Sequence, residues 1–163
     1  VKLEVDASHA RLVGRLGSAG VPVVAHMGLR PQQVRAQGGY LAAGQTRDQA
    51  ASLLEQAQLF LQQGAAMLLL EAVPDQLSQE VVAVANSSNA GAIVPVIGCG
   101  AGNSCHGHVV VLQDLLGMTD WQPPFAPPMA DLGEQVRETA AKWAEVVNSC
   151  QYLQHDHPYK MCT

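Results

Sequence analysis

The chain alternates between two patterns of apolar and polar positions. Short apolar runs bounded by turn residues predict strands at 1–5, 21–28, 65–73, 92–100 and 108–114. Between them, apolar residues recur at helical spacing and predict helices at 8–20, 46–64, 74–86 and 130–150. Thr46 is a typical N-cap residue, and Gly64 is a typical helix stop. Strands that alternate with helices of this length are typical of βαβ units, so we expect an α/β fold with a parallel sheet.

Polar or glycine residues stand at the end of each predicted strand. The five ends carry Glu4, His26, Glu71, the turn 98–100, and Gln113 with Asp114. In parallel α/β folds the active site lies at the carboxyl ends of the strands, both in barrels and in open sheets. The sequence therefore predicts a functional site at this edge of the sheet.

The segment AAMLLLEAVP, residues 65–74, places one carboxylate at the edge of an apolar strand. Glu71 directly follows the apolar run 67–70, so we expect its carboxylate to be partly desolvated. A carboxylate in such surroundings suits general-base catalysis near neutral pH. The alternative is a strand-end residue that simply meets solvent, and the pattern alone leaves both interpretations open.

Three further residues are candidates for binding a substrate or a metal ion. Lys2 and Glu4 are two positions apart on one predicted strand, so their side chains share a face and could line one pocket. They could equally form a surface pair on a half-exposed edge strand. His26, near the end of the second predicted strand, could orient a substrate oxygen or serve as a structural hydrogen-bonding residue.

The glycine-rich segment GCGAGNSCHGH, residues 98–108, contains parts of two known motifs. Its glycine spacing does not complete the dinucleotide-binding fingerprint. Cys99, Cys105, His106 and His108 do not have the spacing of a usual zinc site. We therefore interpret the segment as a loop whose backbone can approach a ligand closely.

Composition narrows the possible partners. The chain of 163 residues has a formal net charge of −5 and no basic run, which argues against nucleic acid as a partner. No apolar run approaches the roughly 18 residues that span a bilayer, so we expect no membrane partner. The hydrophobic content of 48% is enough for a single domain over 1–163. Four cysteines without a paired framework favour a cytoplasmic location.

Several pieces of the sequence, taken in order, resemble the ketopantoate hydroxymethyltransferase family. They are VKLE (1–4), HMGLRPQ (26–32), GGY (38–40), LLLEAVP (68–74), IGCGAG (97–102), GHVVVLQDLLGM (107–118), FAPPMADLGEQVRE (125–138) and HDHPY (155–159). Each piece alone is unspecific, but the combination is specific and covers nearly the whole chain. The resemblance implies a (β/α)8 TIM-type barrel, of which this chain holds about the last five βα units.

The same resemblance implies an enzyme of pantothenate and coenzyme A biosynthesis. Such an enzyme transfers a hydroxymethyl group from 5,10-methylenetetrahydrofolate to 3-methyl-2-oxobutanoate, with Mg²⁺ as its usual metal. Glu71 matches the residue that takes a proton from the carbon next to the ketone. Lys2 and His26 match residues that bind the 2-oxo acid, and Glu4 matches a carboxylate near the magnesium ion. The resemblance also implies a homo-oligomer, commonly a decamer.

The sequence departs from the pattern of this family at several positions. Asp6 stands where the second of two glycines usually follows VKLE, and Arg30 stands where threonine is usual. Further departures are His106, His108 and Gln113. They bear on the substrate loops and on folate affinity more than on proton abstraction.

The chain begins inside a strand-like pattern at Val1, so we expect it to be the C-terminal part of a longer protein. The resemblance implies that three earlier strands, with two aspartates that hold Mg²⁺, precede Val1. We therefore expect that the 163 residues alone neither bind Mg²⁺ tightly nor turn over substrate.

Two alternative functions remain open at this point. The first is a folate-independent, Mg²⁺-dependent lyase or aldolase barrel that acts on a 2-oxo acid. The second is a non-catalytic half-barrel that assembles with a partner chain, because an incomplete barrel leaves strand edges unpaired.

Overall fold

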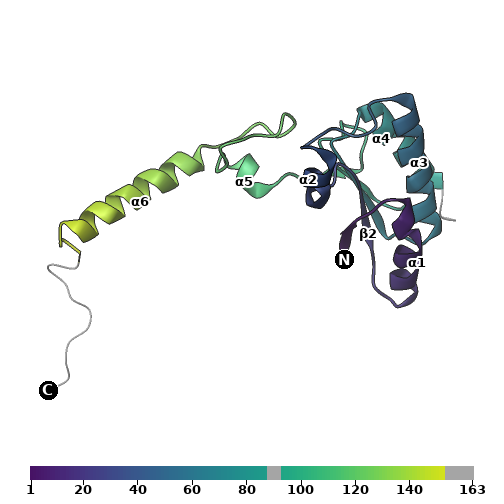
Figure 1. The fold of residues 1–163 in the computed structure, drawn as a ribbon, viewed down its shortest axis with the longest axis horizontal. Coiled ribbons are helices and arrows are strands. Elements are labelled where there is room, and N and C mark those ends of the chain that lie inside the picture. The colour runs from purple at the N-terminus through teal and green to yellow at the C-terminus, as the bar shows by residue number, and fades with distance from the viewer. Residues whose placement is uncertain (88–92, 153–163) are drawn as a thin grey trace, which may run out of the picture. The chain divides into compact units, whose positions relative to one another are not determined.

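The computed structural model describes residues 1–87 and 93–152. The chain divides into two compact units, Val1–Val110 and Val111–Thr163 (Figure 1). A single domain over 1–163 stays a prediction. The sequence piece at 155–159 and Cys162 lie outside the described residues.

The first unit is built on a five-stranded parallel sheet. Its strands are β1 (Lys2–Glu4), β2 (Val24–Gly28), β3 (Met67–Glu71), β4 (Val96–Cys99) and β5 (Gly107–His108). They lie side by side in chain order, and each neighbouring pair is parallel. A doubly wound sheet would reverse its strand order at a switch point, whereas a barrel keeps sequential order. The predicted α/β fold is confirmed, and the sheet is consistent with part of a TIM-type barrel.

Helices connect the strands of this unit. The long ones are α1 (Ala10–Ser18), α3 (Arg47–Gln62) and α4 (Asp75–Ser87). Short turns of helix lie at η1 (Ala7–His9), η2 (Pro31–Gln33) and α2 (Val34–Gln37). The three predicted long helices of this unit are confirmed with small changes in their bounds. The prediction that Thr46 caps α3 is confirmed, because its side chain accepts a hydrogen bond from the backbone N–H of Gln49.

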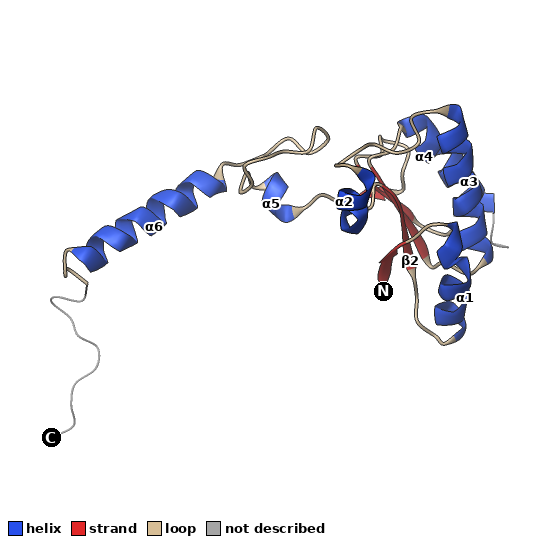
Figure 2. Ribbon diagram, viewed as in Figure 1, coloured by secondary structure: helices blue, strands red, loops and turns tan. Residues whose placement is uncertain are grey.

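The hydrophobic core lies between one face of the sheet and the long helices α1, α3 and α4, which occupy the same side of the strands in Figure 2. Alternate strand residues enter it, because successive side chains point to opposite faces. The strand contribution is Ala25, Met27, Leu68, Leu70 and Val96. The helices contribute Val13, Ala57, Phe60 and Val81, all fully buried. The strand residues of the opposite face, among them Leu69, are not part of this core, and we call that face the open face.

The fifth predicted strand, 108–114, is wrong over most of its length. Only Gly107–His108 pairs with β4, and the next contact, from the N–H of Val109 to the carbonyl oxygen of Gly98, ends the ladder. Residues Leu112–Leu115 form a helical turn, α5, instead. A short apolar run forms a strand only where a neighbouring strand can pair with it and a layer covers it. Val109, Val110 and Val111 are exposed here, so neither condition is met beyond His108.

The second unit begins with α5 and contains one long helix, α6 (Leu132–Asn148). This helix confirms the prediction for 130–150, and the proline-rich segment before it is a loop. The helix starts close to the preceding turn, where the N–H of Gly133 donates to the carbonyl oxygen of Gly117. Among the described residues, no helix combines the length and the apolar character needed to cross a membrane.

Candidate active site

The four residues predicted to form a site lie on one face of the sheet. Glu4 pairs in register with His26, and Gly28 pairs in register with Glu71. Since alternate residues share a face, Lys2, Glu4, His26 and Glu71 all project from the side opposite the helix-packed core. Glu4 and Glu71 end their strands, and His26 lies two positions before the end of β2. The fold therefore brings Glu4, His26 and Glu71 to the carboxyl edge of one open face, with Lys2 on the same face at the amino end of β1.

Glu71 and His26 form a close polar pair on this face. The distance between Nε2 of His26 and Oε2 of Glu71 is 3.0 Å, and only 1% of the His26 side chain and 16% of the Glu71 side chain are exposed. Neither ring nitrogen of His26 has a well-aligned hydrogen-bond partner among the described residues. Buried polar atoms without a partner are rare in folded proteins. The imidazole therefore has hydrogen-bonding capacity that the described residues do not use.

The main chain around Glu71 is held on both sides. The N–H of Leu29 donates to its carbonyl oxygen at 2.8 Å, and the N–H of Ala72 donates to the carbonyl oxygen of Cys99 at 2.9 Å. Gly28 has a φ of +89°, and a side-chain carbon there would lie 2.3 Å from the same Glu71 oxygen. Ala72 itself has a φ of +50°, which costs a residue other than glycine about 1–3 kcal/mol. The two hydrogen bonds hold this strained backbone and so fix the direction in which the chain leaves β3 after Glu71.

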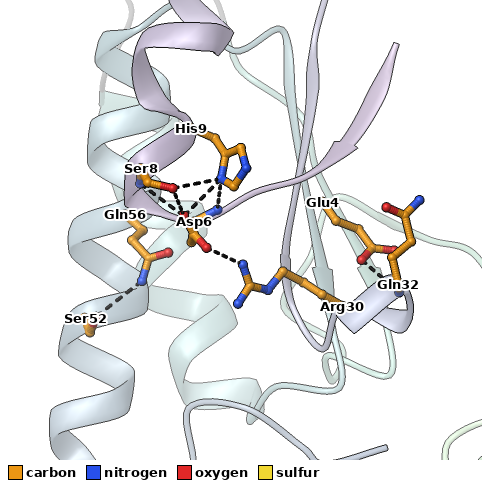
Figure 3. Close-up of polar contacts among 8 residues, drawn as sticks. All are labelled: Glu4, Asp6, Ser8, His9, Arg30, Gln32, Ser52 and Gln56. Atoms are coloured by element: carbon orange, nitrogen blue, oxygen red, sulfur yellow. Dashed lines mark hydrogen bonds and ion pairs between the residues drawn. The ribbon is translucent and has the colours of Figure 1, made fainter. Parts of the chain in front are cut away.

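Glu4 is half-buried at the end of β1, and its contacts are shown in Figure 3. The backbone N–H of Gln32 donates to its two carboxylate oxygens at 3.0 and 3.3 Å. A carboxylate is the type of hard oxygen ligand that Mg²⁺ prefers, and Mg²⁺ is often held by one or two carboxylates together with substrate and water. In the part of the chain that the structure describes, no three potential ligands cluster. Glu4 thus fits the role of one carboxylate of a magnesium site completed by other groups.

Lys2 is exposed at the beginning of β1. Two residues along a strand separate it from Glu4 by roughly 7 Å, on the same face. A flexible ammonium group at this distance can reach an anion bound near Glu4.

Gln113 and Asp114 do not end a strand, because β5 stops at His108. Both residues lie in α5, which belongs to the second unit. The segment 98–108 does form a loop with a short strand. Within it, Nδ1 of His106 accepts a hydrogen bond from the N–H of Val96 at 3.0 Å, which occupies the ring in a structural role.

Cys105 lies in the same loop and is partly covered. Burial raises the pKa of its thiol, against the lowering effect of a hydrogen bond with the side chain of Ser78. A raised pKa keeps a thiol protonated and poorly nucleophilic. The loop therefore shows no activated cysteine at this position.

Two residues that the sequence interpretation did not select lie beside the candidate site. The carboxylate of Asp6 accepts hydrogen bonds from the hydroxyl and the N–H of Ser8, and forms an ion pair with Arg30 at 2.7 Å (Figure 3). The Ser8 hydroxyl and then the Arg30 guanidinium hold the pKa of Asp6 far below its usual range. The sequence Asp-Ala-Ser has the character of a helix cap, but no local pattern pairs Asp6 with an arginine so distant in the chain.

A hollow of about 570 Å³ lies next to this ion pair, on the side of α3. Its walls come from Asp6 and Arg30, the loop 41–44, and the first turns of α3. Lys2, Glu4, His26 and Glu71 do not line it. The hollow is thus separate from the open face that carries the four predicted residues.

Comparison with known proteins places the chain in a family. The sequence profile described as Ketopantoate hydroxymethyltransferase matches residues 1–155. Three similar curated proteins carry the name 3-methyl-2-oxobutanoate hydroxymethyltransferase. The protein from Pyrobaculum islandicum is 37% identical over 157 residues, which cover 96% of this chain and 58% of the relative.

The other two relatives give the same result. The protein from Clostridium botulinum is 36% identical over 162 residues, covering 99% of this chain and 56% of the relative. The protein from Synechococcus elongatus is 40% identical over 155 residues, covering 93% of this chain and 55% of the relative. The chain thus spans a little over half the length of the curated relatives it matches. Because the profile matches almost the entire sequence, this chain belongs to the ketopantoate hydroxymethyltransferase family.

Proposed function

We propose that the protein transfers a hydroxymethyl group from 5,10-methylenetetrahydrofolate to 3-methyl-2-oxobutanoate, forming ketopantoate for pantothenate and coenzyme A biosynthesis. The observation that carries the proposal is the close pair of Glu71 and His26 at the carboxyl edge of the open face. Family membership and the names of the relatives support the reaction class.

Glu71 is the proposed base. Its carboxylate takes a proton from the carbon next to the substrate ketone, and the electron pair of that C–H bond becomes the enolate. The enolate carbon then forms the new carbon–carbon bond to the one-carbon unit. Both bonds between that carbon and the folate nitrogens break, one water molecule supplies the hydroxyl group, and tetrahydrofolate leaves. The Glu71 side chain is only 16% exposed, so little water competes for its carboxylate during proton transfer.

Lys2 and His26 are the proposed binding residues for the 2-oxo acid. The ammonium group of Lys2 offsets the negative charge of the substrate carboxylate. The imidazole of His26, which lacks an aligned partner among the described residues, can hold a substrate oxygen or a water molecule beside Glu71. Glu4 is the residue of this chain that would face Mg²⁺. When bound, that ion supplies electrostatic stabilisation of the negative charge that develops on the keto oxygen.

The test is proton exchange at the substrate carbon, followed in heavy water by proton NMR, together with folate-dependent turnover. In the complete protein, Glu71→Gln should lower both rates by about 10²–10⁴-fold, the usual contribution of a general base. Glu55→Gln removes a carboxylate from an exposed position of α3 and should leave both rates unchanged. Full exchange activity in Glu71→Gln would overturn the assignment of the base.

The same assay separates the alternatives. Exchange and product formation without folate would favour a folate-independent lyase or aldolase. No exchange with any 2-oxo acid, together with assembly with another chain, would favour a non-catalytic half-barrel. The isolated 163-residue chain should show neither tight Mg²⁺ binding nor turnover.

We further propose a cytoplasmic homo-oligomer, with the decamer as the specific expectation. Mass measurement of the purified complete protein by light scattering tests the oligomeric state. A monomer at working concentration would contradict it.

A further inference from the structure

The ion pair between Asp6 and Arg30 joins the segment that follows β1 to the segment that follows β2. Asp6 follows β1 by two residues, and Arg30 follows β2 by two residues. Oδ2 of Asp6 and a terminal guanidinium nitrogen of Arg30 are 2.7 Å apart, with 17% of the Arg30 side chain and 38% of the Asp6 side chain exposed. A partly covered, charge-assisted contact of this length is among the stronger polar contacts in proteins.

A second contact, between Gln32 and Glu4, joins the same two parts of the chain. Arg30 is the residue before the short helix η2, Pro31–Gln33. The N–H of Gln32, in the middle of that helix, donates to the carboxylate of Glu4. Residues 30–32 are therefore attached to the end of β1 at two points, which are visible side by side in Figure 3. The first point is the ion pair with Asp6, and the second is the hydrogen bond to Glu4.

The second contact is the one that sets the direction of the Glu4 carboxylate. Among the described residues, the N–H of Gln32 is the hydrogen-bond donor to that carboxylate. A glutamate side chain on an open face otherwise rotates among several rotamers. The position of the N–H depends on where η2 lies, and η2 is preceded directly by the residue that Asp6 holds.

We propose that Arg30 and Asp6 are positioning residues that act through Glu4. Their ion pair fixes η2, the N–H of Gln32 then orients the Glu4 carboxylate, and the oriented carboxylate favours binding of the Mg²⁺-bound 2-oxo acid. The inference rests on the proposed function for the identity of the ligand.

We call the ion pair of Asp6 with Arg30 and the hydrogen bond from Gln32 to Glu4 the clamp. The first arm of the test measures the clamp without any ligand. Arg30→Ala in the complete protein should accelerate hydrogen exchange at the Gln32 amide about tenfold or more, since the loss of a hydrogen bond to a charged group is worth at least that factor. Asp6→Asn should have the same effect, and Arg30→Lys should restore part of the protection. Arg35→Ala is the matched control, because it removes an exposed arginine from the neighbouring α2.

The second arm measures binding by calorimetry with 3-methyl-2-oxobutanoate and Mg²⁺. Arg30→Ala should weaken binding about tenfold and raise KM with kcat little changed, as expected when a binding contact common to ground and transition states is lost. In a Glu4→Gln background, Arg30→Ala should have no additional effect on binding, because the residue through which it acts is already altered. Arg35→Ala should match the wild type.

The outcomes separate this inference from the proposed function. Unchanged exchange at Gln32 in Arg30→Ala overturns the clamp. Faster exchange with unchanged binding, or a full effect of Arg30→Ala in the Glu4→Gln background, overturns the action through Glu4. A wild-type protein that binds the 2-oxo acid but shows no folate-dependent turnover overturns the proposed function and leaves the positioning result standing. A wild-type protein that binds no 2-oxo acid overturns both.

Discussion

Replacing Gly28 by alanine tests the close approach of β2 to β3 beside Glu71. The added carbon would lie 2.3 Å from the carbonyl oxygen of Glu71 and 2.8 Å from Cγ1 of Val73. That oxygen also accepts the hydrogen bond from the N–H of Leu29. Backbone atoms cannot turn aside as a flexible side chain can. Gly28→Ala must therefore separate the two strand ends locally or change the backbone conformation at residue 28.

The size of the effect follows from three contributions. The left-handed backbone at φ +89° costs an alanine about 1–2 kcal/mol. The forced overlap costs about 1–3 kcal/mol, as overpacking does elsewhere. Reduced freedom of the unfolded chain offsets about 0.4–1 kcal/mol. The free energy of unfolding should therefore fall by about 3 kcal/mol, within limits of about 1–5 kcal/mol.

Gly64→Ala is the matched control, because Gly64 has a φ of +80° and nothing within 4 Å of the added carbon. It should cost only about 1 kcal/mol, the conformational part alone. Urea unfolding followed by far-UV circular dichroism measures both variants. Tryptophan fluorescence would not serve, since Trp121 and Trp143 both lie in the second unit. Equal losses in the two variants would refute the argument that the approach to Glu71 is sterically closed.

Three further predictions concern the core, the pH dependence and the cysteines. Phe60→Ala should lower the free energy of unfolding by about 3–5 kcal/mol in the same urea assay, because Phe60 is fully buried; a loss near zero would contradict its place in the core. Hydrogen bonds from the side chain and the backbone of Ser104 lower the pKa of Asp75 from its ordinary value of 3.8. A lowered pKa stabilises the fold above the ordinary value, and this contribution is lost as the pH falls through the folded-state pKa. The thermal midpoints of wild type and Asp75→Asn should therefore converge on acidification, and a constant difference would argue against the hydrogen bonds. Iodoacetamide should label Cys105, whose thiol pKa is raised by burial, more slowly than the exposed Cys150, as peptide mapping by mass spectrometry can show; equal rates would contradict that burial.

Local sequence was sufficient to predict the conformation of segments whose structure depends on adjacent residues. The run 67–70 forms the buried strand that its composition predicts, and Thr46 caps α3 as its position predicts. The run Val109–Val111 has the same apolar character, yet it forms no strand. The difference is that β3 has a partner strand on each side, whereas the chain beyond His108 has none to extend the ladder among the described residues.

The candidate site also combines features that the sequence predicts with features that depend on tertiary contacts. The sequence alone determined that Glu4 and Glu71 end strands of a parallel α/β fold and that His26 lies close to the end of another, because periodicity and turn residues are local properties. Only the tertiary structure decided that Nε2 of His26 lies 3.0 Å from Glu71 and that Arg30 reaches Asp6. Those contacts depend on the register between strands and on the path of a loop, and both are set by packing between segments that are distant in the chain.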